Sequence, residues 1–257
     1  MHTATPASAE SMGEGEQIVW SVVIPAYNEA SRLPLYLREV VAFFEGRGEP
    51  FEVVVVDDGS HDATRDRVGD VRASHDQVRL IALPQNRGKG YAVRVGMMNA
   101  RGAFRLFADA DGATPIVELK RLEGPLQAGA DIVIGSRALR DPTVSVQARR
   151  HRVWAGRVFN WLVARLGLRG IADSQCGFKC FRGPVAEDLF RCLRTDGFGF
   201  DVELLLLAQK RGYRIVEVAV NWADQPGGKV KVLTEGPRML WQILSARAVL
   251  ARRQHRR

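Results

Sequence analysis

Hydrophobic positions along the chain predict an alternation of strands and helices. Apolar runs rich in β-branched residues recur at strand length, and the segments between them carry apolar residues at helical spacing. The predicted strands are residues 19–27, 51–60, 78–83, 103–114, 131–137, 173–181 and 214–222. The predicted helices are residues 33–44, 61–75, 86–100, 115–128, 143–168, 184–194 and 201–211. Because most of these strands are apolar on both faces, the pattern predicts an α/β fold with a mostly parallel sheet flanked by helices.

Polar side chains follow four of the predicted strands, at the point where each strand ends. They are Tyr27-Asn28-Glu29, Asp57-Asp58, Asp109 with Asp111, and Ser136-Arg137. Since the carboxyl ends of parallel strands meet at one edge of a sheet, these groups are expected to lie close together. A single such cluster is typical of turns and helix caps. Four of them at successive strand ends favour a binding or catalytic site.

Two of these clusters and one further loop have side chains that suit a phosphorylated ligand. The two carboxylates of Asp109 and Asp111 suit Mg²⁺ or Mn²⁺, which bind through few protein ligands and the phosphates of a substrate. Asp57 and Asp58 either accept hydrogen bonds from ribose hydroxyls or a base N–H, or cap the next helix. The segment 86–90 (NRGKG) can present Lys89 and backbone N–H groups to a diphosphate. It matches neither the P-loop nor the dinucleotide-binding fingerprint, which counts against an ATPase and a dehydrogenase.

Charge changes this picture by indicating an anionic partner. The chain has 257 residues, 46% of them apolar, which is typical of a globular protein with one or two domains. With 37 Lys and Arg against 29 Asp and Glu, the net charge is 37 − 29 = +8. Nucleic acid, a phosphorylated substrate or an anionic membrane surface would each fit that value. Acidic groups at three of these strand ends would repel a nucleic-acid backbone, so nucleic-acid binding is the least favoured of the three partners.

The two ends of the chain have different compositions. Residues 1–16 are small, polar and acidic, and are predicted to be a disordered leader. Residues 233–257 are predicted to be a basic amphipathic helix and tail. This segment either lies on an anionic membrane or packs on the core with a solvated Arg tail. The sequence contains no uncharged run of about 18 apolar residues, so no membrane-spanning helix is predicted. The three cysteines are too few for a disulfide framework and favour a reduced, cytoplasmic setting.

Taken together, the motifs resemble the family 2 glycosyltransferases of the GT-A fold. The segments that carry the resemblance are VVIPAYNE (22–29), VVVVDDGS (53–60), NRGKGYAVRVGM (86–97), FADADGAT (107–114) and GSR (135–137). Three others, DSQCGFKCF (173–181), FGFDVELL (198–205) and EVAVNW (217–222), look like the dolichyl-phosphate glucosyltransferase branch. The resemblance implies a catalytic domain over residues 17–232, a UDP-sugar donor, a polyprenyl-phosphate acceptor and inversion at the transferred sugar.

The resemblance also implies a role for individual residues. Nucleotide-sugar binding would fall to Pro25, Ala26, Tyr27, Glu29, Asp57, Asp58, Lys89, Asp109 and Ala110, and the metal to Asp109 and Asp111. The catalytic residues would be Asp111, Asp173 and Arg137, and the acceptor phosphate would meet Arg137, Arg150 and Lys229. The implied location is the cytoplasmic face of a membrane, with peripheral contact. The alternatives are a GDP-mannose donor or a soluble acceptor.

Overall fold

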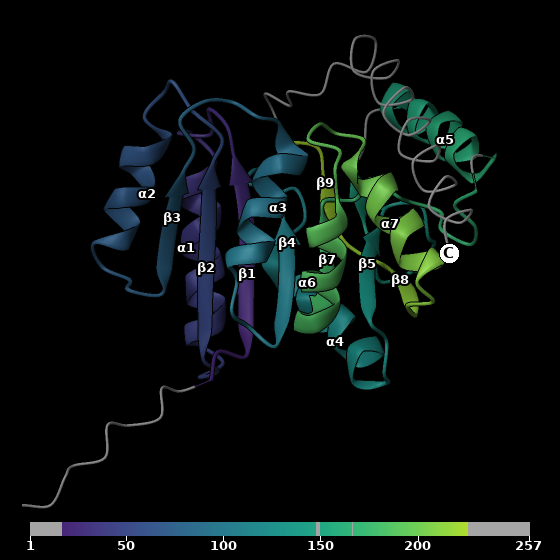
Figure 1. Cartoon of the computed structure of the whole chain (residues 1–257), viewed down its shortest axis with the longest axis horizontal. Coiled ribbons are helices and arrows are strands. Elements are labelled where there is room, and N and C mark those ends of the chain that lie inside the picture. The colour runs from purple at the N-terminus through teal and green to yellow at the C-terminus, as the bar shows by residue number, and fades with distance from the viewer. Residues whose placement is uncertain (1–16, 148–149, 166, 226–257) are drawn as a thin grey trace, which may run out of the picture.

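The computed structural model describes residues 17–147, 150–165 and 167–225 (Figure 1). Its main feature is a seven-stranded sheet. In order across the sheet, the strands are β3 (Val78–Ala82), β2 (Phe51–Asp57), β1 (Trp20–Ala26), β4 (Phe104–Ala108), β7 (Phe178–Arg182), β5 (Ile132–Ser136) and β8 (Ile215–Ala219). β7 is antiparallel to β4 and β5, and the other neighbouring pairs are parallel. The predicted mostly parallel sheet is confirmed.

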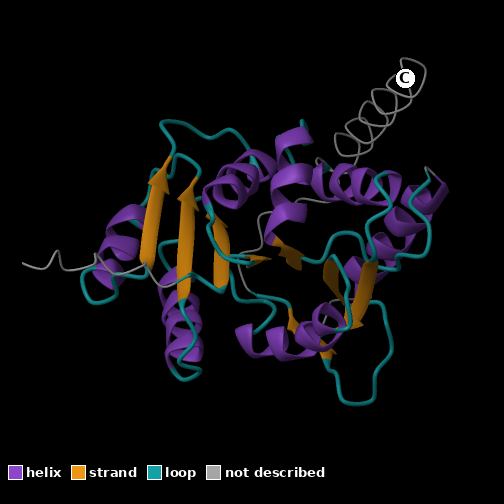
Figure 2. Ribbon diagram, turned by 60° about the horizontal axis from the view of Figure 1, so that its bottom comes forward, coloured by secondary structure: helices purple, strands orange, loops and turns teal. Residues whose placement is uncertain are grey.

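Helices cover both faces of this sheet (Figures 1 and 2). On one face lie α1 (Leu33–Glu45), α2 (Thr64–Arg72), the short 3₁₀ helix η1 (Ile116–Glu118) and α4 (Leu119–Gln127). On the other lie α3 (Lys89–Asn99), α6 (Gly183–Cys192) and α7 (Phe200–Lys210). α5 (Arg150–Arg165) lies at the β8 side of the molecule, near the end to which the arrowheads of β1 and β2 point.

Apolar side chains along β1 and β2 point alternately to the two faces of the sheet, so both faces must be covered by helices. Val22 and Val53 pack into the core beneath α1 and α4. Their chain neighbours Val23 and Val54 pack into the core beneath α3, α6 and α7. Successive side chains of a strand point to opposite faces, so an all-apolar strand is stable only between two layers of helices.

Several predicted strands end earlier than expected, as β4 does at Ala108, and two predicted elements differ more substantially. The predicted helix over 143–168 is helical only from Arg150, because Val146–Gln147 forms the strand β6, which pairs in parallel with β9 (Trp222–Ala223). The predicted strand over 173–181 begins only at Phe178. The backbone N–H groups of Ala172 and Asp173 donate instead to the side chain of Glu217, at 2.9 and 2.8 Å.

The sheet brings the predicted polar clusters to one edge. β1, β2, β4 and β5 run in the same direction, so the residues that follow them emerge on the same side of the molecule. Across the described residues, none of the helices is long and apolar enough to cross a membrane. The predicted leader 1–16 and the whole of the predicted helix and tail 233–257 lie outside the described residues, as do all residues after 225.

Candidate active site

A cavity of about 680 Å³ lies at the carboxyl ends of β1, β2 and β4. Most of the predicted nucleotide-sugar and metal residues line it, namely Pro25, Ala26, Tyr27, Glu29, Asp58, Lys89, Asp109, Ala110 and Asp111. The NRGKG loop also reaches it through Asn86, Arg87 and Gly88. Sequence reasoning did not anticipate Arg32, Ala92, Asp196, Gly197 and Phe198, which complete the lining.

The loop after β1 is fixed to the loop after β2 by side-chain hydrogen bonds. Asn28 adopts a φ of 53°, a left-handed conformation that Asn tolerates better than most residues. Its side-chain oxygen accepts the backbone N–H of His61 at 2.8 Å, and the N–H of Glu29 donates to Thr64 at 2.8 Å. Arg32 donates two hydrogen bonds to the Glu29 carboxylate, from Nε at 2.7 Å and from Nη2 at 2.6 Å. Tyr27 and Glu29 are therefore held at the cavity wall.

Lys89 and Asp109 form an ion pair inside the cavity. The Lys89 Nζ lies 2.7 Å from Asp109 Oδ1, and 5.2 Å from the centroid of the Phe107 ring. Burial alone would lower the pKa of Lys89, but the charges of Asp109 and Asp201 outweigh it and raise that pKa. The ammonium group therefore stays charged, placed where a diphosphate would enter.

The negative charge of the Asp111 carboxylate is only weakly balanced by neighbouring groups. Its Oδ1 accepts the Ala113 N–H at 3.1 Å, and Arg32 approaches its other oxygen only to 3.8 Å. Burial, and then repulsion from Asp109, raise the pKa of Asp111. Two neighbouring carboxylates that repel one another are a suitable setting for a divalent cation.

The donor set fits Mg²⁺ or Mn²⁺. The described residues contain no group of three or more His, Cys, Asp or Glu side chains placed to hold a metal ion. A metal at Asp109 and Asp111 would therefore take oxygen ligands from these two residues and complete its shell with phosphate oxygens and water. This is the usual arrangement for Mg²⁺ beside a nucleotide.

Gly177 forms the floor beneath Asp109. Its carbonyl accepts the Asp109 backbone N–H at 3.1 Å. A Cβ added at residue 177 would overlap the carbon and both oxygens of the Asp109 carboxylate. Only glycine lets the segment before β7 approach the acidic pair so closely.

The two acids of the DDGS segment have different environments. Asp58 lines the cavity and accepts the backbone N–H groups of Arg87 and Gly88 at 2.8 and 2.9 Å, which fixes the NRGKG loop. Burial raises the pKa of Asp58, although these two hydrogen bonds oppose the rise. Asp57 is fully buried, does not line the cavity and is bound by Arg65 Nε at 2.5 Å. The predicted contact of Asp57 with a nucleotide would therefore need that pair to rearrange.

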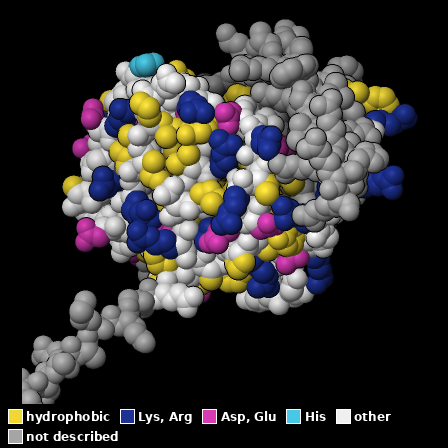
Figure 3. Space-filling model, in the orientation of Figure 1, with side chains coloured by type: hydrophobic (Ala, Val, Ile, Leu, Met, Phe, Trp, Pro, Cys, Tyr) yellow, Lys and Arg dark blue, Asp and Glu magenta, His cyan; other side chains and the backbone are white. Residues whose placement is uncertain are grey.

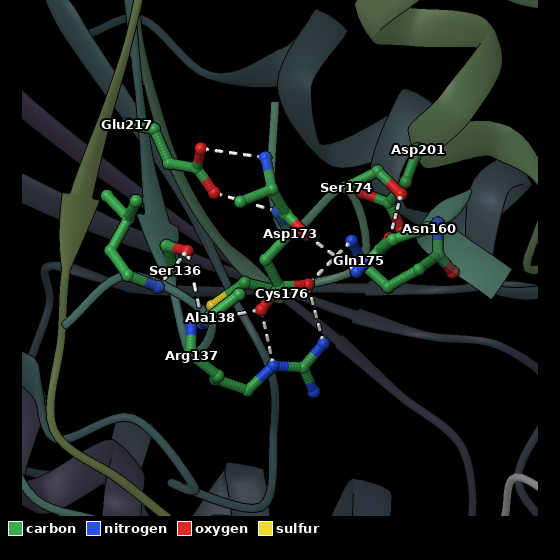
Figure 4. Close-up of polar contacts among 12 residues, drawn as sticks. Ser136, Arg137, Ala138, Asn160, Asp173, Ser174, Gln175, Cys176, Asp201 and Glu217 are labelled. Atoms are coloured by element: carbon green, nitrogen blue, oxygen red, sulfur yellow. Dashed lines mark hydrogen bonds and ion pairs between the residues drawn. The ribbon is translucent and has the colours of Figure 1, made fainter. Parts of the chain in front are cut away.

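A second polar cluster joins the loop after β5 to the loop before β7 (Figure 4). Asp173 accepts the Arg137 backbone N–H at 3.0 Å and binds the guanidinium through Nε at 2.7 Å and Nη2 at 2.8 Å. Burial would lower the pKa of Arg137, but Asp173 outweighs it and raises that pKa. Burial would likewise raise the pKa of Asp173, yet Arg137 holds it below its ordinary value. Both groups are charged, and neither lines the cavity.

Comparison with known proteins identifies the family. The family model described as "Glycosyl transferase family 2" matches residues 21–190. The chain belongs to glycosyl transferase family 2.

Three curated relatives of this family 2 chain carry the name dolichyl-phosphate beta-glucosyltransferase. The protein from Drosophila melanogaster is 40% identical over 242 residues, which cover 89% of this chain and 74% of that relative. The Saccharomyces cerevisiae protein is 35% identical, with 91% of this chain and 75% of the relative covered. The Homo sapiens protein is 40% identical, with coverages of 82% and 69%. The predicted resemblance is thereby confirmed.

Solved structures show the same fold. Glucosyl-3-phosphoglycerate synthase from Mycobacterium tuberculosis, solved with Mn²⁺ and UDP-glucose, superposes with a TM-score of 0.67 at 22% identity. The match covers 90% of this chain and 79% of that one. Mannosyl-3-phosphoglycerate synthase from Rubrobacter xylanophilus gives 0.66 at 22% identity, with coverages of 93% and 76%. The predicted GT-A fold is confirmed.

One buried ion pair of this family 2 chain was not predicted to have a role. Lys179 on β7 is fully buried, and its Nζ donates to Asp201 Oδ1 and to the Cys176 carbonyl, each at 2.5 Å. Burial raises the pKa of Asp201, while the charges of Lys179 and Lys89 oppose the rise. Both residues lie in motifs used for the resemblance, QCGFK and FGFD, but the motifs alone do not reveal that they meet.

Two predicted acceptor-phosphate residues fall outside this description. Lys229 lies beyond residue 225, and Arg150 opens α5 with a side chain that is not among those described. Their roles in a family 2 reaction stay predictions.

Proposed function

We propose that this chain is an inverting glycosyltransferase that moves glucose from UDP-glucose to a polyprenyl phosphate of the dolichyl type. The observation that carries the proposal is the 40% identity to a dolichyl-phosphate beta-glucosyltransferase over 89% of this chain. The cavity supports it, because its volume of about 680 Å³ suits a nucleotide sugar. Its wall also combines carboxylates with Lys and Arg, as a metal-bound diphosphate requires.

In this proposal the donor lies along the cavity. Pro25, Ala26, Tyr27 and Glu29 contact the uridine, and Lys89 contacts the diphosphate. Asp109 and Asp111 hold Mg²⁺ or Mn²⁺, which supplies positive charge to the departing diphosphate. The M. tuberculosis synthase was solved with Mn²⁺ and UDP-glucose, which agrees with a divalent ion in this fold.

The acceptor needs little activation. A phosphate monoester is already anionic at neutral pH, so one of its oxygens attacks the anomeric carbon without a strong general base. The bond from that carbon to the UDP oxygen breaks, and UDP leaves with the electron pair. Attack from the opposite side converts an α-linked donor into a β-linked lipid-phosphate glucose. The protein's main task is therefore to stabilise charge on UDP and to hold two anions together.

Arg137 is the proposed acceptor-phosphate residue among those described. Its Nε and Nη2 are occupied by Asp173, and its guanidinium lies 5.4 Å from the Trp222 ring centroid. Asp109 contributes to the raised pKa of Arg137, so the cluster lies within electrostatic reach of the acidic pair. Arg150 and Lys229 would complete the phosphate site, at the cytoplasmic face of a membrane.

A donor and acceptor panel tests the proposal. The full chain is incubated with Mg²⁺ and either UDP-glucose or GDP-mannose, together with polyprenyl phosphate or 3-phosphoglycerate. Products are identified by mass spectrometry. We expect a hexosyl adduct only from UDP-glucose with the lipid, and none from the Asp111→Asn variant. A product from GDP-mannose, or from the soluble acceptor alone, would contradict the proposed specificity.

A further inference from the structure

Near its end, α5 exposes an aromatic and a basic side chain, Trp161 and Arg165, away from the core. Its sequence, RHRVWAGRVFNWLVAR, contains four Arg, one His and no acidic residue. Trp161 is 56% exposed and is the only aromatic among the exposed large hydrophobic side chains of the described residues. The Arg165 guanidinium lies 4.9 Å from the Trp161 ring centroid, one helical turn away. At the edge where α5 lies, Figure 3 shows hydrophobic and basic side chains beside one another.

The opposite face of α5 attaches the helix to the site. Val163 is buried and Phe159 packs against the core formed with α3, α6 and α7. Asn160 donates to the Ala172 carbonyl at 2.7 Å and accepts the Ser174 hydroxyl at 3.1 Å, as Figure 4 shows in part. These contacts flank Asp173, the residue that binds Arg137.

We infer that α5 is a docking helix for an anionic lipid bilayer, with Trp161 as its interfacial anchor. An aromatic ring with a polar edge favours the membrane–water interface, and Arg beside it pairs with lipid phosphate. The inference rests on the proposed lipid acceptor and deepens it, because the docked helix is bonded to the loop that carries Asp173.

Charge favours a bilayer over the other possible occupants of this face. A second copy of the chain would bring another α5, which also has four Arg and no acid. The chain's own segment 236–257 has six Arg and no acid, so it would be repelled in the same way. Anionic headgroups are the complementary surface. Two further exposed apolar residues, Leu139 and Val146, lie in the chain between Arg137 and α5.

Vesicle partition of the full chain tests the inference without requiring activity. The probe is phosphatidylcholine vesicles with or without phosphatidylglycerol, separated by sedimentation. We expect binding to the anionic vesicles that weakens with added salt. Arg165→Gln should reduce the partition coefficient about fivefold, as expected for one basic residue near an anionic surface. Trp161→Ala should reduce it about tenfold, the order expected for withdrawing an aromatic side chain from an apolar phase.

Matched controls lie on distant elements. Met98→Ala removes an exposed apolar side chain from α3, and Arg67→Gln removes an exposed Arg from α2. Both should leave partition unchanged. In Trp161→Phe, the blue shift of tryptophan emission on adding anionic vesicles should fall, which assigns the contact to this ring.

The outcomes separate this inference from the proposed function. Equal partition of Trp161→Ala, Arg165→Gln and both controls would overturn the docking role. So would a loss of thermal stability in Trp161→Ala well beyond that of Met98→Ala, because it would assign the ring to packing within the chain. If wild type binds vesicles through Trp161 but makes no product with any acceptor, the docking role stands and the proposed reaction fails. With a short, water-soluble prenyl phosphate, all four variants should retain wild-type activity.

Discussion

At the residue scale, the cavity holds opposite charges in contact before any ligand arrives. Lys89 pairs with Asp109 at 2.7 Å, while the ion pair that Asp111 makes with Arg32 is longer, at 3.8 Å. The lysine thus occupies one of the two carboxylates that a metal would use. A diphosphate would attract Lys89 away from Asp109, so donor and metal are expected to bind cooperatively.

Lys89→Met tests this competition. Without the ammonium, Asp109 is free to bind Mn²⁺ in the absence of nucleotide, so Mn²⁺ affinity should rise about tenfold, as for loss of one charged hydrogen bond. UDP affinity should fall, because the diphosphate loses a cation. Mn²⁺ titration by electron paramagnetic resonance and UDP calorimetry measure the two effects. Lys120→Met, on the exposed side of α4, is the control, and a parallel fall of both affinities would contradict the competition.

Gly177 makes a second prediction at this scale. In Gly177→Ala the new methyl group overlaps the Asp109 carboxylate, which must shift away from its position. We expect transfer activity to fall about a hundredfold, the cost typical of an ångström-sized misplacement. Mn²⁺ binding should weaken in parallel. Gly124→Ala on α4, where the added carbon meets nothing within 4 Å, should keep both properties. Normal Mn²⁺ affinity in Gly177→Ala would show that the carboxylate adapts at no cost.

At the element scale, charged side chains replace regular backbone pairing where β5, β7 and β8 approach one another. Arg137 follows β5, Asp173 precedes β7, and Glu217 lies on β8. The Asp173 side chain binds Arg137, and its backbone N–H binds Glu217. The loop 172–177 is therefore held in place by the guanidinium of Arg137 and the carboxylate of Glu217.

Asp173→Asn should destabilise this junction. Arg137 would keep its charge but face a much weaker partner. The free energy of unfolding should therefore fall by about 2–4 kcal/mol, a value between those of an exposed and a fully buried ion pair. Because the pKa of Asp173 lies below its ordinary value, the wild-type contribution is present at neutral pH. It is lost only as the pH falls through that lowered pKa. Urea unfolding should show a stability difference at pH 7 that shrinks in strong acid. A difference independent of pH would argue against the ion pair as its source.

The same junction shows what the sequence could and could not predict. β1 and β2 were predictable because their burial follows from a local run of apolar residues. The residues that hold 172–177 out of the sheet are 36 and 44 positions away, at Arg137 and Glu217. Such contacts leave no periodic signal. The same holds for the cavity lining. The acidic residues at strand ends were predictable, whereas residues 196–198 belong to the loop before α7, which is distant in sequence.

At the scale of the whole molecule, the charges divide by location. Acidic side chains outnumber basic ones in the cavity, with Glu29, Asp58, Asp109, Asp111 and Asp196 against Arg32, Arg87 and Lys89. Basic residues are concentrated in α5 and, in the sequence, in residues 236–257. The net charge of +8 therefore understates the positive charge available to a membrane, since part of the acid is inside the site.

A chain ending at Gly236 tests this division of charge. The truncation removes six Arg and no acid, so the net charge falls from +8 to 8 − 6 = +2. Long-range attraction to an anionic surface should drop accordingly, and the salt dependence of vesicle binding should become shallower. UDP affinity should stay near the wild-type value, because the cavity is built from residues 25–198. Vesicle sedimentation across a salt series, with UDP calorimetry on the same samples, measures both. If the truncated chain keeps α5-dependent binding at low salt, α5 and the C-terminal segment contribute separately to attraction. An equal loss of UDP and vesicle binding would instead assign residues 237–257 to support of the catalytic fold.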